Sequence, residues 1–181
     1  MDRSADSARP ALPTLRTERL ALDPYTPEDE ENFVALFQDQ RVSRWIGDGP
    51  ATEAENRALF HRIFPIYDER RFDVWAVRRI GADGAPAEFI GHAEIKPTDT
   101  VSGHEIVYAL APAAWGAGLG TELAEALVSY GFVALKLPVV YATVAAANEA
   151  SLKVLKRLGF ERVRDITEDD GGVVVVLARE P

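Results

Sequence analysis

Three glycines follow a short apolar segment near the middle of the chain. Residues 105–112 are typical of a strand that ends at a proline, and Gly116, Gly118 and Gly120 then lead into a long helical pattern. Glycine lets the backbone turn sharply or lets another group approach closely. A turn of this kind at a helix start presents unpaired N–H groups and the positive end of the helix dipole. The stretch therefore predicts an anion site, most often one for phosphate.

Two common phosphate-binding motifs do not fit this glycine run. A P-loop ends in Gly-Lys-Ser/Thr, whereas Gly120 is followed directly by Thr121. The dinucleotide fingerprint needs a third glycine where Thr121 stands and an acidic residue at the tip of the next strand. Residues 139–144 supply no such acid. A tight strand–helix turn that binds no ligand is the other interpretation that these residues allow.

A second polar group follows the next predicted strand. Asn148 opens a short helical pattern that ends at Gly159, and Ser151 lies three residues after Asn148. Asn148 suits a helix N-cap and Gly159 suits a C-cap, so the pattern has a purely structural explanation. Its position one strand after the glycine run makes a functional role worth considering as well.

Together the two groups resemble the GCN5-related N-acetyltransferases (GNAT). The pyrophosphate loop of that family is written Q/R-x-x-G-x-G/A, and here Trp115 stands at the Q/R position with Gly118 and Gly120 as the glycines. Residues 148–151 and 158–160 resemble the family's N-x-x-S and L-G-F elements. The Trp-Gly-x-Gly variant, and the Thr-Glu-Arg-Leu run at residues 17–20, are similar to the RimJ/RimL branch.

The resemblance implies an acetyl-CoA site and no metal. Leu110 and Ala111 would bond the pantetheine arm through their backbone, Asn148 would contact the same arm, and the loop would hold the pyrophosphate. The implied cofactor-binding residues are Leu110, Ala111, Trp115, Gly116, Ala117, Gly118, Leu119, Gly120, Thr121 and Asn148. The loop departs from the family pattern because it carries alanines in place of a basic residue. Phosphate binding is therefore expected to rest on backbone amides.

Acetyl transfer to an amine needs a base, because an ammonium ion has no lone pair. Glu105, at the start of the central strand, is the first candidate; a solvated charge at a strand end is the alternative interpretation. His92 and Glu94 come next, since alternation places them on one face of the preceding strand, where both could look into the cleft. Many relatives carry a tyrosine as general acid on the last helix, but Leu155 occupies that position. The resemblance offers Ser151 instead, as a hydrogen-bond donor near the thiol.

The order of elements predicts an α/β (α+β mixed) fold of GNAT type. We expect a mixed, mostly antiparallel sheet of about seven strands with about four helices on both faces. A strand over 14–22, a helix from Thr52 to about Arg71, a hairpin around residues 81–86 and another around 169–172 are the main local expectations. The strands at 105–112 and 139–144 should be parallel, because a long helix connects them. Residues 1–13 are expected to be a flexible leader, and 14–181 a single domain.

Composition limits the remaining possibilities. The chain has 181 residues, a formal charge of −9 and no cysteine, which excludes disulfides and an acyl-cysteine intermediate. Its acidity argues against nucleic-acid binding and suits a cationic substrate. The three histidines have no metal-ligand spacing. The sequence shows no signal peptide and no run long enough to span a membrane, so a cytoplasmic protein is expected.

The sequence thus predicts an acetyl-CoA-dependent N-acetyltransferase that uses direct transfer in a ternary complex. Its expected partners are a small-molecule amine or a peptide N-terminus, with no nucleic acid and no membrane, and a homodimer is a further expectation. A non-catalytic domain that binds acyl-CoA as a sensor or interaction module is the alternative hypothesis.

Overall fold

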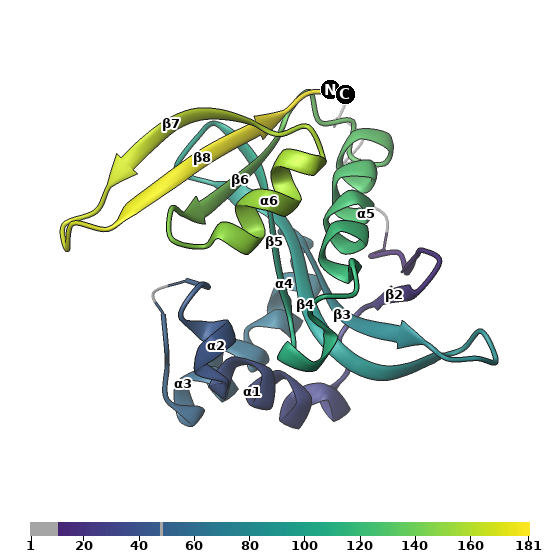
Figure 1. The fold of residues 1–181 in the computed structure, drawn as a ribbon. Helices are drawn as coiled ribbons and strands as arrows, with labels where there is room; N and C mark the ends of the chain where they lie inside the picture. Colours follow the sequence, from purple (N-terminus) through teal and green to yellow (C-terminus); the bar gives the residue numbers. More distant parts are fainter. Residues whose placement is uncertain (1–10, 48) are drawn as a thin grey trace, which may run out of the picture.

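Eight strands form one mixed sheet in the computed structural model of this chain, which describes residues 11–47 and 49–181 (Figure 1). The strand order is β1-β2-β3-β4-β5-β6-β8-β7, and all neighbours are antiparallel except β5 and β6. The strands are β1 Leu15–Arg16, β2 Leu20–Asp23, β3 Asp73–Ile80, β4 Pro86–Thr98, β5 Gly103–Leu110, β6 Val140–Ala145, β7 Glu161–Thr167 and β8 Val173–Arg179. The helices are α1 Glu30–Gln38, α2 Gln40–Ser43, α3 Glu53–His61, α4 Ile63–Asp68, α5 Leu119–Val133 and α6 Glu149–Arg157, with short 3-10 turns η1 Pro27–Asp29 and η2 Pro112–Ala114.

The predicted fold class is confirmed, with one strand more than expected. The segment 14–22 was expected to be a single strand, and this is wrong. It folds as a hairpin in which Leu15 pairs with Leu22, and the Thr17 N–H bonds the Leu20 carbonyl at 2.9 Å across the turn. The predicted β3–β4 and β7–β8 hairpins and the parallel β5–β6 pair are confirmed.

The helix expected from Thr52 to about Arg71 is two helices, α3 and α4. Thr52 caps α3 as expected, since its hydroxyl accepts a bond from the Glu55 N–H at 3.3 Å. The break falls at Arg62, three residues before Pro65. Proline has no N–H and fits only the first turn of a helix, so the chain restarts a helix around it. In the described part of the chain, no helix has the length and apolar character needed to cross a membrane.

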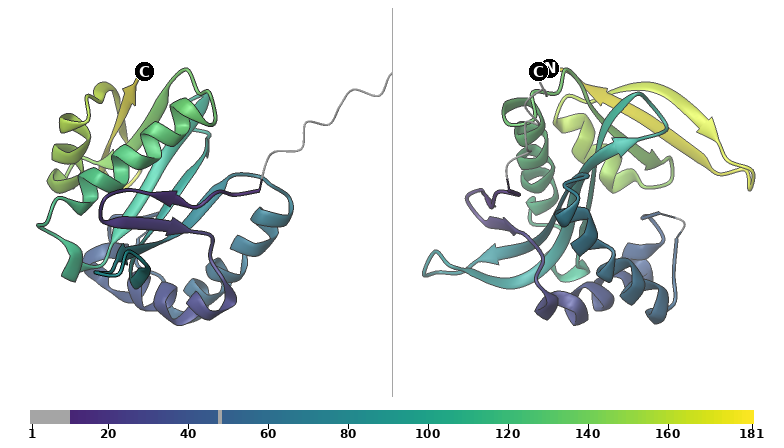
Figure 2. Two further views of the ribbon diagram at one scale, coloured as in Figure 1. Left: turned by 90° about the vertical axis from the view of Figure 1, so that its right-hand side faces the viewer. Right: turned by 180° about the vertical axis from the view of Figure 1, so that it is seen from behind.

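Two hydrophobic cores lie on opposite faces of the sheet. On one face, α5 and α6 cover residues such as Trp75 and Leu127, which are fully buried. On the other face, α1, α3 and α4 cover residues such as Val74 and Ala76, which alternate with Trp75 along β3. Figure 2 shows α5 running across one face while α1–α4 gather on the other. Strand β5 belongs to both cores and can therefore present groups to either side.

The packed domain begins slightly before the expected boundary at Thr14. Most of the leader expected over residues 1–13 lies outside the described residues, which start at Ala11. Leu12 packs against the core under α5, and the Pro13 carbonyl accepts a bond from the Trp75 indole at 2.8 Å. The last residues of the expected leader are therefore part of the folded domain.

Candidate active site

Strands β5 and β6 are paired only at their first residues. His104 lies opposite Val140 and Glu105 opposite Tyr141; beyond that point β6 pairs with β8 alone. Strand β5 nevertheless continues for five more residues to Leu110. The two parallel strands therefore separate after Glu105, and the backbone of β5 on that side has no strand beside it.

Backbone direction along β5 shows which groups face the separation. The Ala111 N–H bonds the Ile90 carbonyl at 2.8 Å, on the β4 side. Backbone groups alternate in direction along a strand, so the N–H groups of Leu110 and Tyr108 point to the side from which β6 has diverged. Of the two backbone donors expected from the sequence, Leu110 is directed into the separation, while the Ala111 amide is already engaged. The Leu110 carbonyl accepts a bond from the Trp115 indole at 2.8 Å.

The glycine loop follows β5 directly and leads into α5. Gly116 and Gly118 have φ of 79° and 77°, which side chains rarely tolerate. Gly118 is the N-cap of α5, and the Glu122 N–H donates the first helical hydrogen bond to the Gly118 carbonyl at 3.2 Å. The N–H groups of residues 119–121 consequently lack helical acceptors, as an anion site requires. Gly120 is different, because a β-carbon there would meet only Val154, at an ordinary 3.9 Å.

Asn148 and Ser151 begin α6 on the same side of the sheet as α5. The Asn148 side chain accepts a bond from the Ser151 N–H at 3.3 Å, so Asn148 is an N-cap as expected. Leu155, at the place where many relatives carry tyrosine, is fully buried in the core. Only Ser151 of the expected catalytic residues therefore lies on this helix.

Tyr108 is a residue that the sequence analysis did not single out. Its hydroxyl is buried, and among the described residues it has no partner in hydrogen-bond geometry. Burial raises the pKa of Tyr108, and the nearby Ser151 side chain lowers it by a smaller amount. The structure thus brings the Tyr108 and Ser151 hydroxyls together where β5 and β6 separate. The sequence offered one signal, because Tyr108 ends the segment Glu-Ile-Val-Tyr that begins at Glu105.

Glu105 lies at the point of separation, on the other face of the sheet. Glu105 lies four residues before Ala109, so the two side chains are on the same face of β5. Because Ala109 belongs to the core under α1–α4, the Glu105 side chain points to that side. The Thr143 hydroxyl donates a hydrogen bond to Glu105 Oε2. The expected base and the Tyr108–Ser151 pair therefore lie on opposite faces of β5, close to the same gap.

His92 and Glu94 form a buried network rather than an open site. His92 is 4% exposed; its Nδ1 lies 2.8 Å from the Tyr25 hydroxyl and its Nε2 lies 3.0 Å from Glu94 Oε1. Burial raises the pKa of Glu94, but the bond and charge of His92 and the charge of Lys96 outweigh this and leave it at about 2. The expectation that both residues look into the cleft is wrong for His92. Glu94, which stays ionised at neutral pH, would be a weak base.

A basic side chain lies beside the glycine loop, although the loop contains none. Arg19, in the turn between β1 and β2, donates from Nη1 to the Ala117 carbonyl at 2.7 Å and from Nε to Glu122 Oε2 at 2.7 Å. Arg19 and Glu122 are 103 residues apart in the sequence. The Thr-Glu-Arg-Leu run was recognised in the sequence, but nothing there connected it with the loop.

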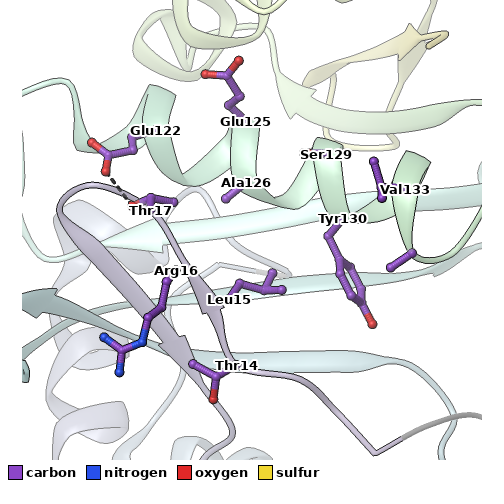
Figure 3. Close-up of a pocket in the computed structure, with 11 residues that line it drawn as sticks. Thr14, Leu15, Arg16, Thr17, Glu122, Glu125, Ala126, Ser129, Tyr130 and Val133 are labelled. Carbon is purple, nitrogen blue, oxygen red and sulfur yellow. Dashed lines mark hydrogen bonds between the residues drawn. The ribbon is translucent and has the colours of Figure 1, made fainter.

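A cavity of about 620 Å³ lies between the β1–β2 hairpin and α5 (Figure 3). Thr17 and Glu122 border it at one end, and Tyr130 and Val133 border it at the other. None of the residues expected to bind acetyl-CoA lines this cavity. We therefore place the candidate site at the β5–β6 separation and not in this cavity.

Comparisons with known proteins show the family and the fold of this chain. Residues 19–161 match the family model of the acetyltransferase (GNAT) domain. The chain is 32% identical over 158 residues to an uncharacterised N-acetyltransferase, YoaA, of Bacillus subtilis, covering 83% of this chain and 84% of that protein. Among solved structures, RimL, a ribosomal L7/L12 α-N-protein acetyltransferase in complex with coenzyme A, is similar in fold (TM-score 0.75, 14% identity, 93% and 98% coverage). So is spermidine N-acetyltransferase of Vibrio cholerae in complex with CoA and spermine (TM-score 0.74, 17% identity, 91% and 96% coverage).

These matches define the class of protein. The sheet, the loop and the family model describe an acyltransferase. The chain belongs to the GNAT acetyltransferase family and is an N-acetyltransferase.

Proposed function

We propose that this enzyme moves the acetyl group of acetyl-CoA directly to a primary amine, within a ternary complex at the β5–β6 separation. The observation that carries the proposal is the continuity of three features. The open edge of β5 leads into the glycine loop, the loop caps α5, and the unpartnered Tyr108 hydroxyl lies beside Ser151 at the same edge. The three features fit an extended thioester: its reacting end would lie beside Tyr108 and Ser151, its arm along β5, and the phosphate group at its far end on the glycine loop.

In this arrangement the cofactor would be held mainly by backbone groups. The Leu110 N–H would bond the pantetheine arm in the manner of a strand, taking the place that β6 vacates. The amides of residues 119–121 would bind the pyrophosphate at the positive end of α5. Gly116 and Gly118 give the loop its left-handed turns, and Trp115 fixes the loop to the end of β5. Asn148 starts the helix that carries Ser151.

Two protons must move during the transfer, and the chain offers a group for each. Glu105 would accept the proton that the acceptor ammonium must lose before its nitrogen can attack. The departing CoA thiolate needs a proton when the C–S bond breaks. Tyr108 can provide it, because burial keeps its hydroxyl protonated at neutral pH, and Ser151 would hydrogen-bond the sulfur or the tyrosine. The Leu110 or Tyr108 N–H would stabilise negative charge on the thioester oxygen.

The residues available favour direct transfer. The chain contains no cysteine that could carry the acetyl group between two half-reactions. We therefore expect the amine to reach the thioester while acetyl-CoA is bound. Kinetics of a ternary complex, with lines that intersect when both substrates are varied, are the expected pattern.

The acceptor would be a primary amine that is cationic in solution. Similar folds are found in RimL, named for a protein N-terminus, and in an enzyme named for spermidine. We infer that this chain is nearer the RimJ/RimL branch, because its Thr-Glu-Arg-Leu and Trp-Gly-x-Gly segments are similar to those of that branch. The charge of −9 would attract a cation of either kind.

Mass spectrometry of a mixed panel tests the proposal. The purified protein is incubated with acetyl-CoA and a set of peptides with free N-termini, polyamines and amino acids, and acetylated products are identified. Gly118→Asp, which puts a carboxylate where phosphate would bind, should abolish product formation. Acetyl-CoA binding without any acetylated amine would instead favour the sensor hypothesis, and equal product from Gly118→Asp would exclude the loop as the phosphate site.

A further inference from the structure

Four hydrogen bonds fasten the turn between β1 and β2 to the glycine loop and to the first turn of α5. The Thr17 hydroxyl and the Arg19 N–H both donate to Glu122 Oε1, at 2.6 and 2.8 Å. Arg19 Nε donates to Glu122 Oε2 at 2.7 Å, and Arg19 Nη1 donates to the Ala117 carbonyl at 2.7 Å. Figure 3 shows Thr17 and Glu122 facing each other across the end of the cavity. We call Thr17, Arg19 and Glu122 the clamp.

Glu122 would oppose phosphate binding if it were free. It is a carboxylate in the first turn of α5, next to the amides that would bind the pyrophosphate. Partial burial raises the pKa of Glu122, but the bonds from Thr17 and Arg19 outweigh this and hold the pKa below its usual value. The carboxylate therefore stays ionised, and the clamp holds it on the hairpin side with a guanidinium against it. The clamp thus holds this negative charge away from the anion site and pairs it with a guanidinium.

Arg19 also fixes the direction of one peptide group in the loop. A trans peptide is planar, and its carbonyl and N–H point in opposite directions. Because the Ala117 carbonyl points to Arg19, the Gly118 N–H points away from it. Gly118 at φ 77° is the residue where the loop turns into α5. Without Arg19, the peptide between residues 117 and 118 could flip and replace an N–H donor by a carbonyl oxygen at the anion site.

We propose that the clamp is the positioning device of the cofactor loop, with Arg19 as its central residue. It acts through the loop: it orients the Ala117–Gly118 peptide, holds Glu122 aside and puts a positive charge next to a loop with no basic residue of its own. The proposal rests on the proposed function, because it takes the ligand of the loop to be the pyrophosphate of acetyl-CoA. It also gives a role to the Thr-Glu-Arg-Leu run.

Activity with two acetyl donors distinguishes a positioning role of Arg19 from a purely structural one. Acetyl-CoA carries the pyrophosphate, whereas S-acetylpantetheine has the same thioester and arm without any phosphate. With an acceptor from the panel above, Arg19→Ala should lower kcat/KM for acetyl-CoA by about tenfold or more, mostly through KM. For S-acetylpantetheine the change should be less than about twofold. Equal losses with both donors, or no loss with acetyl-CoA, would overturn the proposal.

Two further variants test charge and orientation. Arg16 is exposed on the same hairpin, so Arg16→Ala removes the same charge away from the clamp. This variant should leave kcat/KM unchanged with both donors. Arg19→Lys keeps the charge, but a single ammonium cannot reproduce the planar guanidinium that donates to Glu122 and to the Ala117 carbonyl at the same time. It should recover only part of the loss; full recovery would mean that charge, and not orientation, is what Arg19 contributes, and would contradict the positioning role.

Calorimetry with CoA keeps this test distinct from that of the function. If the wild-type protein binds CoA but acetylates no amine, the proposed function fails, while the clamp is still tested by the CoA affinity. In that case Arg19→Ala should raise Kd by about tenfold and Arg16→Ala should not. No CoA binding by the wild-type protein would overturn both proposals.

Discussion

The surroundings of the Tyr108 hydroxyl are hard to explain by stability alone. The hydroxyl is buried without a hydrogen-bond partner among the described residues, and such a group costs about 1–3 kcal/mol. A catalytic role accounts for that cost, because the sulfur of a bound thioester would supply the missing partner. Glu105, on the other face of β5, would complete the pair of proton-transfer groups.

Replacing Tyr108 by phenylalanine distinguishes a catalytic role of its hydroxyl from a structural one. Tyr108→Phe removes only the unpartnered oxygen, so stability to urea should be unchanged or higher by about 1 kcal/mol. Turnover of acetyl-CoA should fall by about 10- to 100-fold, since the thiolate loses its proton donor. An aryl thioester has a more acidic thiol and needs less help, so with that donor the variant should lose much less activity. A loss of the same size with both donors would exclude Tyr108 as the acid.

Glu105→Gln tests the base in a different way. The effect should be largest near about pH 6–7, where an amine is mostly protonated, and should fade toward about pH 10, where a primary amine loses its proton to water. The measurement is kcat/KM for the acceptor across this range. A ratio of wild type to variant that does not change with pH would mean that Glu105 is not the base. Glu94 would not replace it, because its pKa of about 2 leaves it weakly basic.

The sequence predicted some of these residues and could not predict others. Gly118, Asn148, Ser151 and Glu105 were identified because each lies in a short motif that local spacing defines. Tyr108 and Arg19 were not, since their significance comes from contacts across the fold. Tyr108 meets Ser151 only after α6 packs on the sheet, and Arg19 meets a residue 103 positions away.

At the scale of single elements, the start of α5 would serve both the fold and the proposed ligand. At Gly120 the effect on the fold and the effect on the ligand can be measured separately, because the residue is helical and a β-carbon there would fit beside Val154. Gly120→Ala should stabilise the protein, by at most about 1 kcal/mol, through better helix propensity. It should leave binding of CoA unchanged, because the added methyl group would lie beside Val154 and the family pattern accepts alanine at this position. A clear loss of CoA affinity would contradict this, because it would mean that the phosphate lies where the methyl group is added.

The buried network on β4 makes a prediction about stability and pH. The folded-state pKa of Glu94 is about 2, below its ordinary value of 4.5, so its contribution to stability is present above about pH 4.5 and is lost as pH falls toward 2. The expected slope is on the order of 1 kcal/mol per pH unit. Urea unfolding of the wild type and of Glu94→Gln should therefore converge as pH falls through this range. Parallel curves would contradict the assigned pKa.

The elements themselves were predicted where turn residues or caps mark their ends. The β7–β8 hairpin was expected from its Asp-Asp-Gly-Gly turn, and the parallel β5–β6 pair from the length of the helix between them. The β1–β2 hairpin was missed, because its turn lacks glycine and proline and is held by contacts to Glu122. The split between α3 and α4 was also missed, because the segment from Thr52 to about Arg71 was expected to be one helix.

For the whole molecule, the separation of β5 and β6 joins two parts of the fold. Strands β1–β5 with α1–α4 form one part, and β6–β8 with α6 form the other (Figure 1). They are connected by two residue pairs of the sheet, by the Thr143–Glu105 hydrogen bond, and by helix α5 with the core that both parts share. A ligand bound along β5 would contact both parts, which would explain why the proposed acetyl-CoA site draws residues from segments 110–121 and 148–151.

Hydrogen exchange with and without CoA tests this account most directly. If the cofactor lies along β5 with its pyrophosphate on the loop, saturating CoA should slow amide exchange in peptides that cover residues 108–122 and 148–151. The cavity between the β1–β2 hairpin and α5 provides the comparison, and peptides covering residues 125–134 should change little. Protection confined to residues 14–17 and 125–134, or no protection in 108–122, would contradict the β5–β6 separation as the acetyl-CoA site.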